Sequence, residues 1–230
     1  MSEQLLKAIL RLFAVVAKED EVTHQERDQI RTFLEEHVSD SAVESYLKKF
    51  DDFTRNLTPK SGDISMEIGR VNELCQQVNS DLTQKQKVVI ILEIINIIQA
   101  DGSISDREKQ LVDAIGSNFK ILPKELEAIT TFVLGKQAAQ LDHPQILIIN
   151  ASPAGSFTAS HHVYRSHLTG FIAVLYVEQS EFYFIKYLGI TTLYLNSQLL
   201  KSRRVDIFPT GSTIRGDKIE TIYYSDVVGK

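Results

Sequence analysis

The apolar residues of this chain change their periodicity once, near residues 141–144 (LDHP). Before this point they recur every three or four residues, which is typical of amphipathic helices. After it they alternate with polar residues and include many β-branched and aromatic side chains, which is typical of strands. The length of 230 residues is enough for two domains. The sequence therefore predicts an α+β protein with an all-helical domain over residues 1–140 and a β domain over residues 141–230.

Start signals for helices are frequent in the first domain. Four segments fit the capping box, in which a hydroxyl accepts from the third backbone N–H and the acid or amide at that position reaches back. These segments begin at Thr23, Ser41, Thr83 and Ser105. Pro123 suits the first position of a last helix, which should run to about Gly135. We expect a bundle of about seven helices.

Two strongly apolar segments, residues 5–13 and 88–98, are interpreted as core helices. Lys7 and Arg11 interrupt the first, so it does not predict a signal peptide. The second contains Glu93 and is about half the length that a membrane span needs. We therefore expect no direct insertion into a membrane.

The second domain contains short segments with strand character, separated by turn residues. A compact β-sandwich or partial barrel is the expected arrangement. The polar stretch 151–169 is expected to be a long loop. The candidate strands are Gln145–Asn150, Phe171–Val177, Phe182–Tyr187, Leu193–Leu195, Val205–Phe208 and Ile219–Tyr224.

Charge and cysteine content narrow the class of function. The net charge is −5, so the chain has no excess of positive charge for phosphates, and we expect no nucleic-acid partner. The single Cys75 cannot form an intramolecular disulfide, and its apolar helical setting suggests a small core residue. A reducing, cytoplasmic setting is expected.

An internal duplication with an offset of 82 residues is the strongest local feature of the helical domain. Residues 12–30 align with residues 94–112, so that Glu19 meets Asp101 and Glu26 meets Glu108. If the two acidic turns lie together, these four side chains form a candidate site for a divalent cation. The alternative is a tight turn followed by a capping box, which accounts for the glutamates at 26 and 108 without any ligand.

Residues 101–108 (DGSISDRE) also match the second half of an EF-hand loop. A calcium site of that type needs oxygen ligands at loop positions one and three. Those positions hold Ile97 and Gln99 in this copy, and Val15 and Ala17 in the other. Calcium binding of the EF-hand type is therefore not expected.

The apolar helix followed by residues 99–108 (QADGSISDRE) and a second helix resembles the TerB-like domain of tellurite-resistance proteins. The resemblance covers about residues 1–137 and implies an all-helical, internally duplicated domain of about seven helices. It also implies acidic, metal-associated positions at Asp101 and Glu108 and, through the repeat, at Glu19 and Glu26. The first copy departs from the motif, because Glu19-Asp20 stands where the second has Asp101-Gly102.

Residues 193–200 (LYLNSQLL), followed by residues 205–208 and 211–215, resemble the last strands of forkhead-associated (FHA) domains. Ser197 stands where those domains usually have Gly. The upstream Gly-Arg and Ser-x-x-His motifs, with which FHA domains bind phosphothreonine, are missing. We therefore expect a β module that packs against or contacts a neighbour, rather than one that reads phosphopeptides.

The order of these parts resembles the N-terminal region of certain large bacterial ABC-transporter ATP-binding proteins. That resemblance implies a non-catalytic, cytoplasmic regulatory or interaction region whose ATPase domain would follow residue 230. Its expected partner is a protein, such as the ATPase or membrane part of the same transporter, at the inner face of the membrane. The alternative is a free-standing TerB-like module that binds metal or serves a stress response.

Searches for catalytic motifs in the sequence favour no enzyme and no organic cofactor. Residues 211–218 (GSTIRGDK) place an acid where a phosphate-binding loop requires Lys. The only histidine cluster, His161, His162 and His167, has no cysteine near it and fits no common zinc spacing. We interpret these histidines as part of a solvated polar loop.

Overall fold

A computed structural model describes residues 2–17, 22–57, 64–100, 104–153 and 161–228. The chain divides into two compact units, Met1–Leu126 and Glu127–Lys230, which we call the helical unit and the β unit. The division falls inside the helix α7 (Pro123–Leu134). The expected combination of a helical region with a following β region, an α+β layout, is confirmed.

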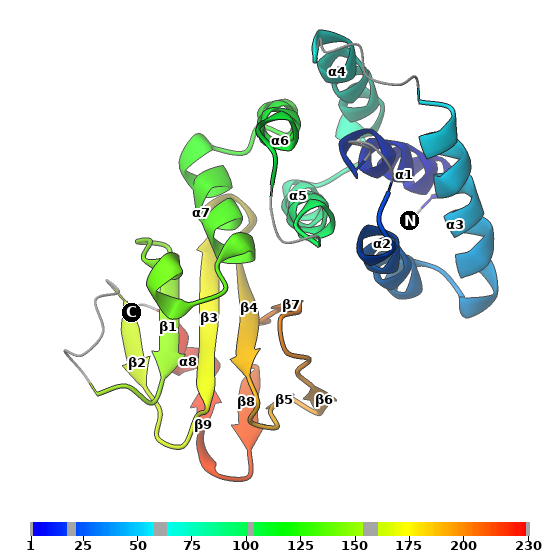
Figure 1. Ribbon diagram of the computed structural model, residues 1–230. Coiled ribbons are helices and arrows are strands. Elements are labelled where there is room, and N and C mark those ends of the chain that lie inside the picture. The colour runs from blue at the N-terminus through cyan, green and yellow to red at the C-terminus, as the bar shows by residue number, and fades with distance from the viewer. Residues whose placement is uncertain (1, 18–21, 58–63, 101–103, 154–160, 229–230) are drawn as a thin grey trace. The chain divides into compact units, whose positions relative to one another are not determined.

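The helical unit is built from six complete helices in its described part and the first turn of α7 (Figure 1). Among its described residues, α1 packs against α3, α4, α5 and α6, so α1 lies at the centre of the unit. The bounds of the six helices are α1 Glu3–Ala17, α2 His24–His37, α3 Asp40–Arg55, α4 Ser65–Asn79, α5 Gln84–Ile98 and α6 Asp106–Asn118.

The two most apolar helices form the core of the helical unit, as the sequence predicts. Eleven residues of α1 are buried, and α5 buries eight. Cys75 on α4 is fully buried, and burial raises the pKa of its thiol to about 12. This thiol is therefore a protonated core side chain at neutral pH. Among the described residues, no helix is long and apolar enough to cross a membrane.

Three of the four predicted capping boxes are confirmed, at Thr23, Thr83 and Ser105. The prediction at Ser41 is wrong, because the helix starts two residues earlier than that motif requires. Ser39 is the N-cap and makes no side-chain cap bond, and α3 begins at Asp40. Ser41 therefore lies inside the first turn. The sequence at residues 61–63 (SGD) also predicts the start of a helix, and these residues lie outside the described part of the chain.

The β unit contains two sheets in its described part. The five-stranded sheet has the order β2-β1-β3-β4-β7 and the four-stranded sheet the order β6-β5-β8-β9. The strand bounds are β1 Ile146–Asn150, β2 His162–Tyr164, β3 Gly170–Val177, β4 Phe182–Gly189, β5 Tyr194–Leu195, β6 Gln198–Leu199, β7 Val205–Ile207, β8 Thr213–Gly216 and β9 Ile219–Tyr223. A short helix, α8 (Tyr224–Val227), follows the last strand.

The two sheets share one apolar core, as expected for a β-sandwich. Ile172 and Val174 of β3 lie in the same buried cluster as Ile214 and Ile222 of the second sheet. Since neighbouring residues of a strand point to opposite faces, the other face of the large sheet carries Ala173 and its neighbours. That face is also buried, which explains why β1 is covered on both sides.

One expected loop contains a strand. The stretch 151–169 includes β2, which pairs in parallel with β1 through the register Ile148↔His162. Only three residues long, β2 has no alternating apolar pattern that could reveal it. Residues 154–160 of this stretch lie outside the described part.

Lys186 of β4 is 3% exposed and points to the face of the large sheet opposite the sandwich core. Its ammonium donates hydrogen bonds to the backbone carbonyls of Val133 at 3.0 Å and Gly135 at 2.8 Å, and to that of Phe132. These carbonyls belong to the last turn of α7 and the residue after it. A single buried lysine therefore ties the end of α7 to the sheet, within the β unit (Figure 1).

Candidate functional site

The described acidic residues of the repeat lie at the starts of two helices. Glu26 belongs to the first turn of α2 and is 5% exposed. Its Oε2 accepts the backbone N–H of Thr23 at 2.7 Å and the Thr23 hydroxyl at 2.9 Å. In return, the Thr23 hydroxyl accepts the backbone N–H of Glu26 at 3.2 Å. This carboxylate therefore serves to begin the helix.

Glu108 has the same role in α6 and is equally buried. Its Oε2 accepts the backbone N–H of Ser105 at 2.8 Å, and the Ser105 hydroxyl accepts the backbone N–H of Glu108 at 3.2 Å. Its neighbour Arg107 donates to Oε2 of Glu67 on α4 at 2.8 Å and to the carbonyl of Val15 on α1 at 3.3 Å. The residues around this motif therefore connect three helices.

The other two residues of the predicted metal site, Glu19 and Asp101, lie outside the described residues. Within the part of the chain that the structure describes, no group of three or more His, Cys, Asp or Glu side chains could hold a metal ion. The structure therefore places Glu26 and Glu108 each in a cap of its own helix. The four-residue site stays a prediction.

All three clustered histidines take part in ordered backbone structure, and the carbonyl of His161 accepts the backbone N–H of Ile148 at 3.0 Å. His162 lies in β2, and its Nε2 is 2.8 Å from Oδ1 of Asn150 on the neighbouring β1. The same Asn150 oxygen accepts the backbone N–H of Ser152 at 2.8 Å. His167 has a positive φ of 62° and lies in the turn before β3. These contacts are those of a strand and a turn.

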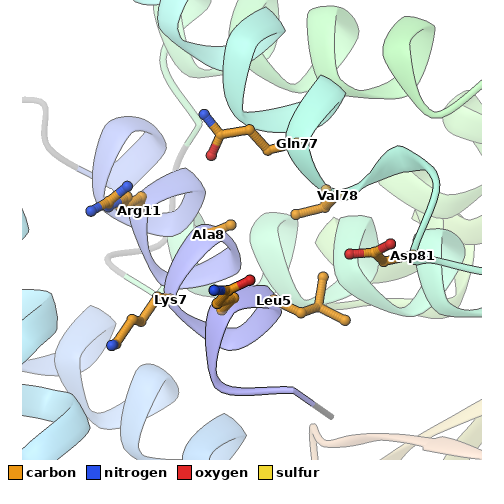
Figure 2. A pocket seen from close by; sticks show the side chains of 8 residues that line it. Leu5, Lys7, Ala8, Arg11, Gln77, Val78 and Asp81 are labelled. Atoms are coloured by element: carbon orange, nitrogen blue, oxygen red, sulfur yellow. The ribbon is translucent and has the colours of Figure 1, made fainter.

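A feature that the sequence did not reveal is a groove between α1 and α4 (Figure 2). The groove consists of two pockets, and the first has a volume of about 420 Å³. Figure 2 shows Lys7 and Arg11 of α1 along one side, with Gln77 and Val78 of α4 and Asp81 of the following turn on the other. Cationic, carboxylate, amide and aliphatic groups thus meet in one place.

A second pocket of about 280 Å³ adjoins the first, because Arg11 and Gln77 line both. We call the two pockets together the α1–α4 groove. The second pocket is bounded by the ring of Phe53 on α3, and the guanidinium carbon of Arg11 lies 5.0 Å from the centre of that ring.

The charged side chains along the groove differ in whether they form ion pairs. Lys7 forms an ion pair with Glu3 at 2.8 Å, and hydrogen bonds from Lys7 and Lys49 lower the pKa of the Glu3 carboxyl. In the described part of the chain Arg11 is exposed and makes no ion pair, and its recorded contact is the Phe53 ring. The lining also includes Arg70, Glu73 and Asp81, so the groove carries charges of both signs.

Sequence reasoning had no signal for this groove. It treats Lys7 and Arg11 as the exposed face of an amphipathic helix, which is correct for α1 alone. The groove exists because α4, which begins more than fifty residues later, packs alongside that face.

A comparison with known protein families matches residues 6–131 to the family described as tellurite resistance protein TerB. The match covers more than half of the 230 residues. The chain belongs to the TerB family. The match runs from α1 into α7 and so spans the capping boxes and all of the α1–α4 groove except Gln4 and Leu5. No curated protein and no solved structure matches the chain significantly.

The TerB match ends at residue 131, before the first strand of the β unit. Family membership therefore supports the prediction of a TerB-like helical region. The architecture of the β unit, two packed sheets after a helix, comes from the structure alone.

Proposed function

We propose that this TerB-family chain is a non-catalytic regulatory or interaction region that works with a bacterial ABC-type transporter ATPase on the cytoplasmic side of the membrane. The observation that carries the proposal is the use of the described acidic residues of the TerB motif. Glu26 and Glu108 are buried and bonded to their own helix starts. They thereby serve the starts of α2 and α6, whereas the α1–α4 groove presents exposed charged groups that a partner can contact.

The β unit supports the same proposal through the hairpin that resembles FHA domains. Asn196 has a positive φ of 55° at the turn between β5 and β6. Its Oδ1 accepts the backbone N–H of Thr213 at 3.1 Å, and its Nδ2 donates to the Ser212 hydroxyl at 3.2 Å. Asn tolerates the left-handed backbone conformation of this turn, and its side chain binds residues 212 and 213 before β8. These two properties explain why the Leu-Asn pattern occurs there. We propose that this sandwich presents loops to a partner protein.

The test uses the ABC-type ATPase encoded in, or next to, the same reading frame. We expect the purified chain to co-elute with that ATPase in size-exclusion chromatography. We also expect ATP turnover at saturating ATP to change at least twofold. An ATPase from an unrelated transporter is the control and should show neither effect. Separate elution together with unchanged turnover would refute the transporter proposal.

A second candidate function is a metal-binding TerB module, and the internal repeat favours it. The repeat places Glu26 and Glu108 at equivalent positions, each seven residues after an acidic residue of the aligned pair Glu19 and Asp101. A cation at one hundred times its dissociation constant would stabilise the fold by about 2.7 kcal/mol. Thermal unfolding with calcium, magnesium, manganese or zinc tests this candidate. A melting temperature that none of the four ions changes would remove it.

A further inference from the structure

The second pocket of the α1–α4 groove combines an apolar base with polar side chains. It has a volume of about 280 Å³ and is lined by residues of α1, α3 and α4 and of the segment that follows α3. Its base is formed by the buried side chains of Ala14, Val15 and Leu74. Phe53 and Leu57 also line it and are half-buried, so a ligand can reach them. An apolar base with a few polar groups is typical of small-molecule sites, whose volumes begin at about 300 Å³.

Two exposed side chains of opposite charge line this pocket, Arg11 on α1 and Glu73 on α4. Among the described residues neither of them forms an ion pair. The guanidinium of Arg11 is held over the ring of Phe53, which lines the second pocket and not the first. One cation and one anion of the same small pocket are therefore both open to a ligand.

The other charged side chains of the groove are engaged or lie outside this pocket. Arg70, one turn before Glu73 on α4, lines the pocket but is half-buried and has an interaction of its own. Lys7 and Asp81 line only the first pocket, and Lys7 pairs with Glu3 at 2.8 Å. The exposed pair of Arg11 and Glu73 therefore decides which charges a ligand of the second pocket should carry.

A ligand with a single charge suits this pair poorly. An anion attracted by Arg11 is repelled by Glu73, and a cation meets the reverse situation. A ligand that carries both charges is attracted by both side chains. In a free α-amino acid the carboxylate and the ammonium are attached to the same carbon, so both fit within one small pocket. The guanidinium offers paired N–H donors to the carboxylate, and the carboxylate of Glu73 accepts from the ammonium.

We propose that the second pocket of the α1–α4 groove binds a free α-amino acid with an apolar side chain. The carboxylate of the ligand lies at Arg11, its ammonium at Glu73, and its side chain against Phe53 and Leu57. The carboxamides of two exposed residues, Asn56 and Gln77, supply further hydrogen bonds. This inference goes beyond the proposed function, because the site lies within the helical unit and needs neither a transporter nor a partner protein.

The experiment titrates the complete 230-residue chain with free valine, leucine, methionine and phenylalanine and follows its amide signals by NMR. We expect saturable shifts at α1, α3 and α4 with at least one of them. The best ligand is then compared with glycine, which lacks the side chain, and with two analogues that each lack one charge. For leucine these analogues are 4-methylpentanoate and 3-methylbutylamine. Each of the three compounds should bind at least tenfold more weakly than the amino acid.

Two variants assign the charges of the ligand to the charges of the pocket. Arg11→Gln should weaken binding of the amino acid about tenfold and leave binding of the amine analogue unchanged. Glu73→Gln should weaken binding of the amino acid by a similar factor, but it should not weaken binding of the carboxylate analogue. Both side chains are exposed, so the fold does not depend on their burial.

Lys109→Gln and Asp28→Asn are the matched controls, because these exposed charged residues of α6 and α2 line neither pocket. Their affinities should stay within twofold of the wild type. The proposal is overturned if none of the four amino acids gives saturable shifts, or if an analogue with one charge binds as tightly as the amino acid. It is also overturned if Arg11→Gln or Glu73→Gln binds like the wild type, or if the shifts map to another surface. The transporter proposal is tested with the ATPase, so the two proposals can fail separately.

Discussion

Both units of this protein place a buried charged side chain at a terminus of a helix. The charge is negative at the helix starts of the helical unit and positive at the helix end in the β unit, and the two kinds of contact differ in how far apart the partners lie in the sequence. In the helical unit the carboxylates of Glu26 and Glu108 accept hydrogen bonds from backbone N–H groups at the starts of α2 and α6. In the β unit the ammonium of Lys186 donates to carbonyls at the end of α7. Both arrangements satisfy the unpaired groups of a helix terminus and agree with its dipole.

The difference lies in where the partner comes from. Each carboxylate bonds to a residue three positions earlier, whereas Lys186 bonds to carbonyls more than fifty residues earlier. The first kind of contact forms as soon as the helix does. The second kind requires that α7 is already docked on the sheet, so it reports on tertiary structure.

The largest expected effect comes from removing α7 from the β unit. A fragment of residues 141–230, the domain expected from the sequence, lacks the carbonyls that Lys186 binds. It also lacks the buried Ile129 and Phe132 of the same helix. We expect this fragment to be unfolded and a fragment of residues 121–230 to fold, as measured by the dispersion of amide signals in NMR spectra. A well-dispersed spectrum of the shorter fragment would contradict this assignment of α7.

Lys186→Met should have the next largest effect, since methionine is also unbranched but donates no hydrogen bond. Leaving buried carbonyls without donors costs about 1–3 kcal/mol for each group, so we expect a loss of about 3 kcal/mol. Urea unfolding followed by the near-UV signal of tyrosine reports on this unit, because seven of the eight tyrosines lie in it. Lys201→Met, at an exposed turn lysine, is the control and should change little. An equal loss in both variants would show that Lys186 is not a specific cap.

The stability that Lys186 contributes should also depend on pH. Burial, aided by the charge of Lys136, lowers the pKa of Lys186 from 10.5 to about 8. Between these two values the unfolded chain binds more protons than the folded chain, so stability rises with pH across this window. A difference of one between the folded and unfolded pKa corresponds to about 1.4 kcal/mol.

The measurement is the difference in the free energy of unfolding between the wild type and Lys186→Met, from pH 7 to pH 10.5. Titrations that the two proteins share, such as those of the tyrosines, cancel in this difference. The difference should increase in favour of the wild type above pH 8. If the difference stays constant or decreases, the hydrogen bonds to the α7 carbonyls raise the pKa of Lys186 at least as much as burial lowers it, and the lysine stays charged.

The same contrast explains which parts of the structure the sequence could predict. Three capping boxes, the start of α7 at Pro123 and the two core helices depend on contacts within a few residues, and the predictions there are confirmed. The prediction at Ser41 is wrong because two nearby serines compete for the N-cap position, and Ser39 occupies it. The strand β2, the role of Lys186 and the α1–α4 groove each depend on a segment far away in the sequence.

The smallest expected effects separate hydrogen bonding from charge at the helix starts. Glu108→Ala removes the acceptor for the Ser105 backbone N–H, and we expect a loss of about 1 kcal/mol, typical of a helix cap. Glu108→Gln should cost less than half of that, because glutamine can accept the same bond. The protein contains this arrangement already, since Oε1 of Gln86 accepts the backbone N–H of Thr83 at 2.9 Å at the start of α5.

Thermal unfolding followed by the helical far-UV signal measures both variants, with Lys109→Ala on the exposed face of the same helix as the control. If Glu108→Gln costs as much as Glu108→Ala, the negative charge is what matters at this position. The capping interpretation would then be insufficient, and the metal-binding candidate would gain support. If the glutamine variant keeps most of the stability and a divalent cation changes neither protein, the TerB motif at residues 105–108 serves to start a helix, as its partner at Thr23 does.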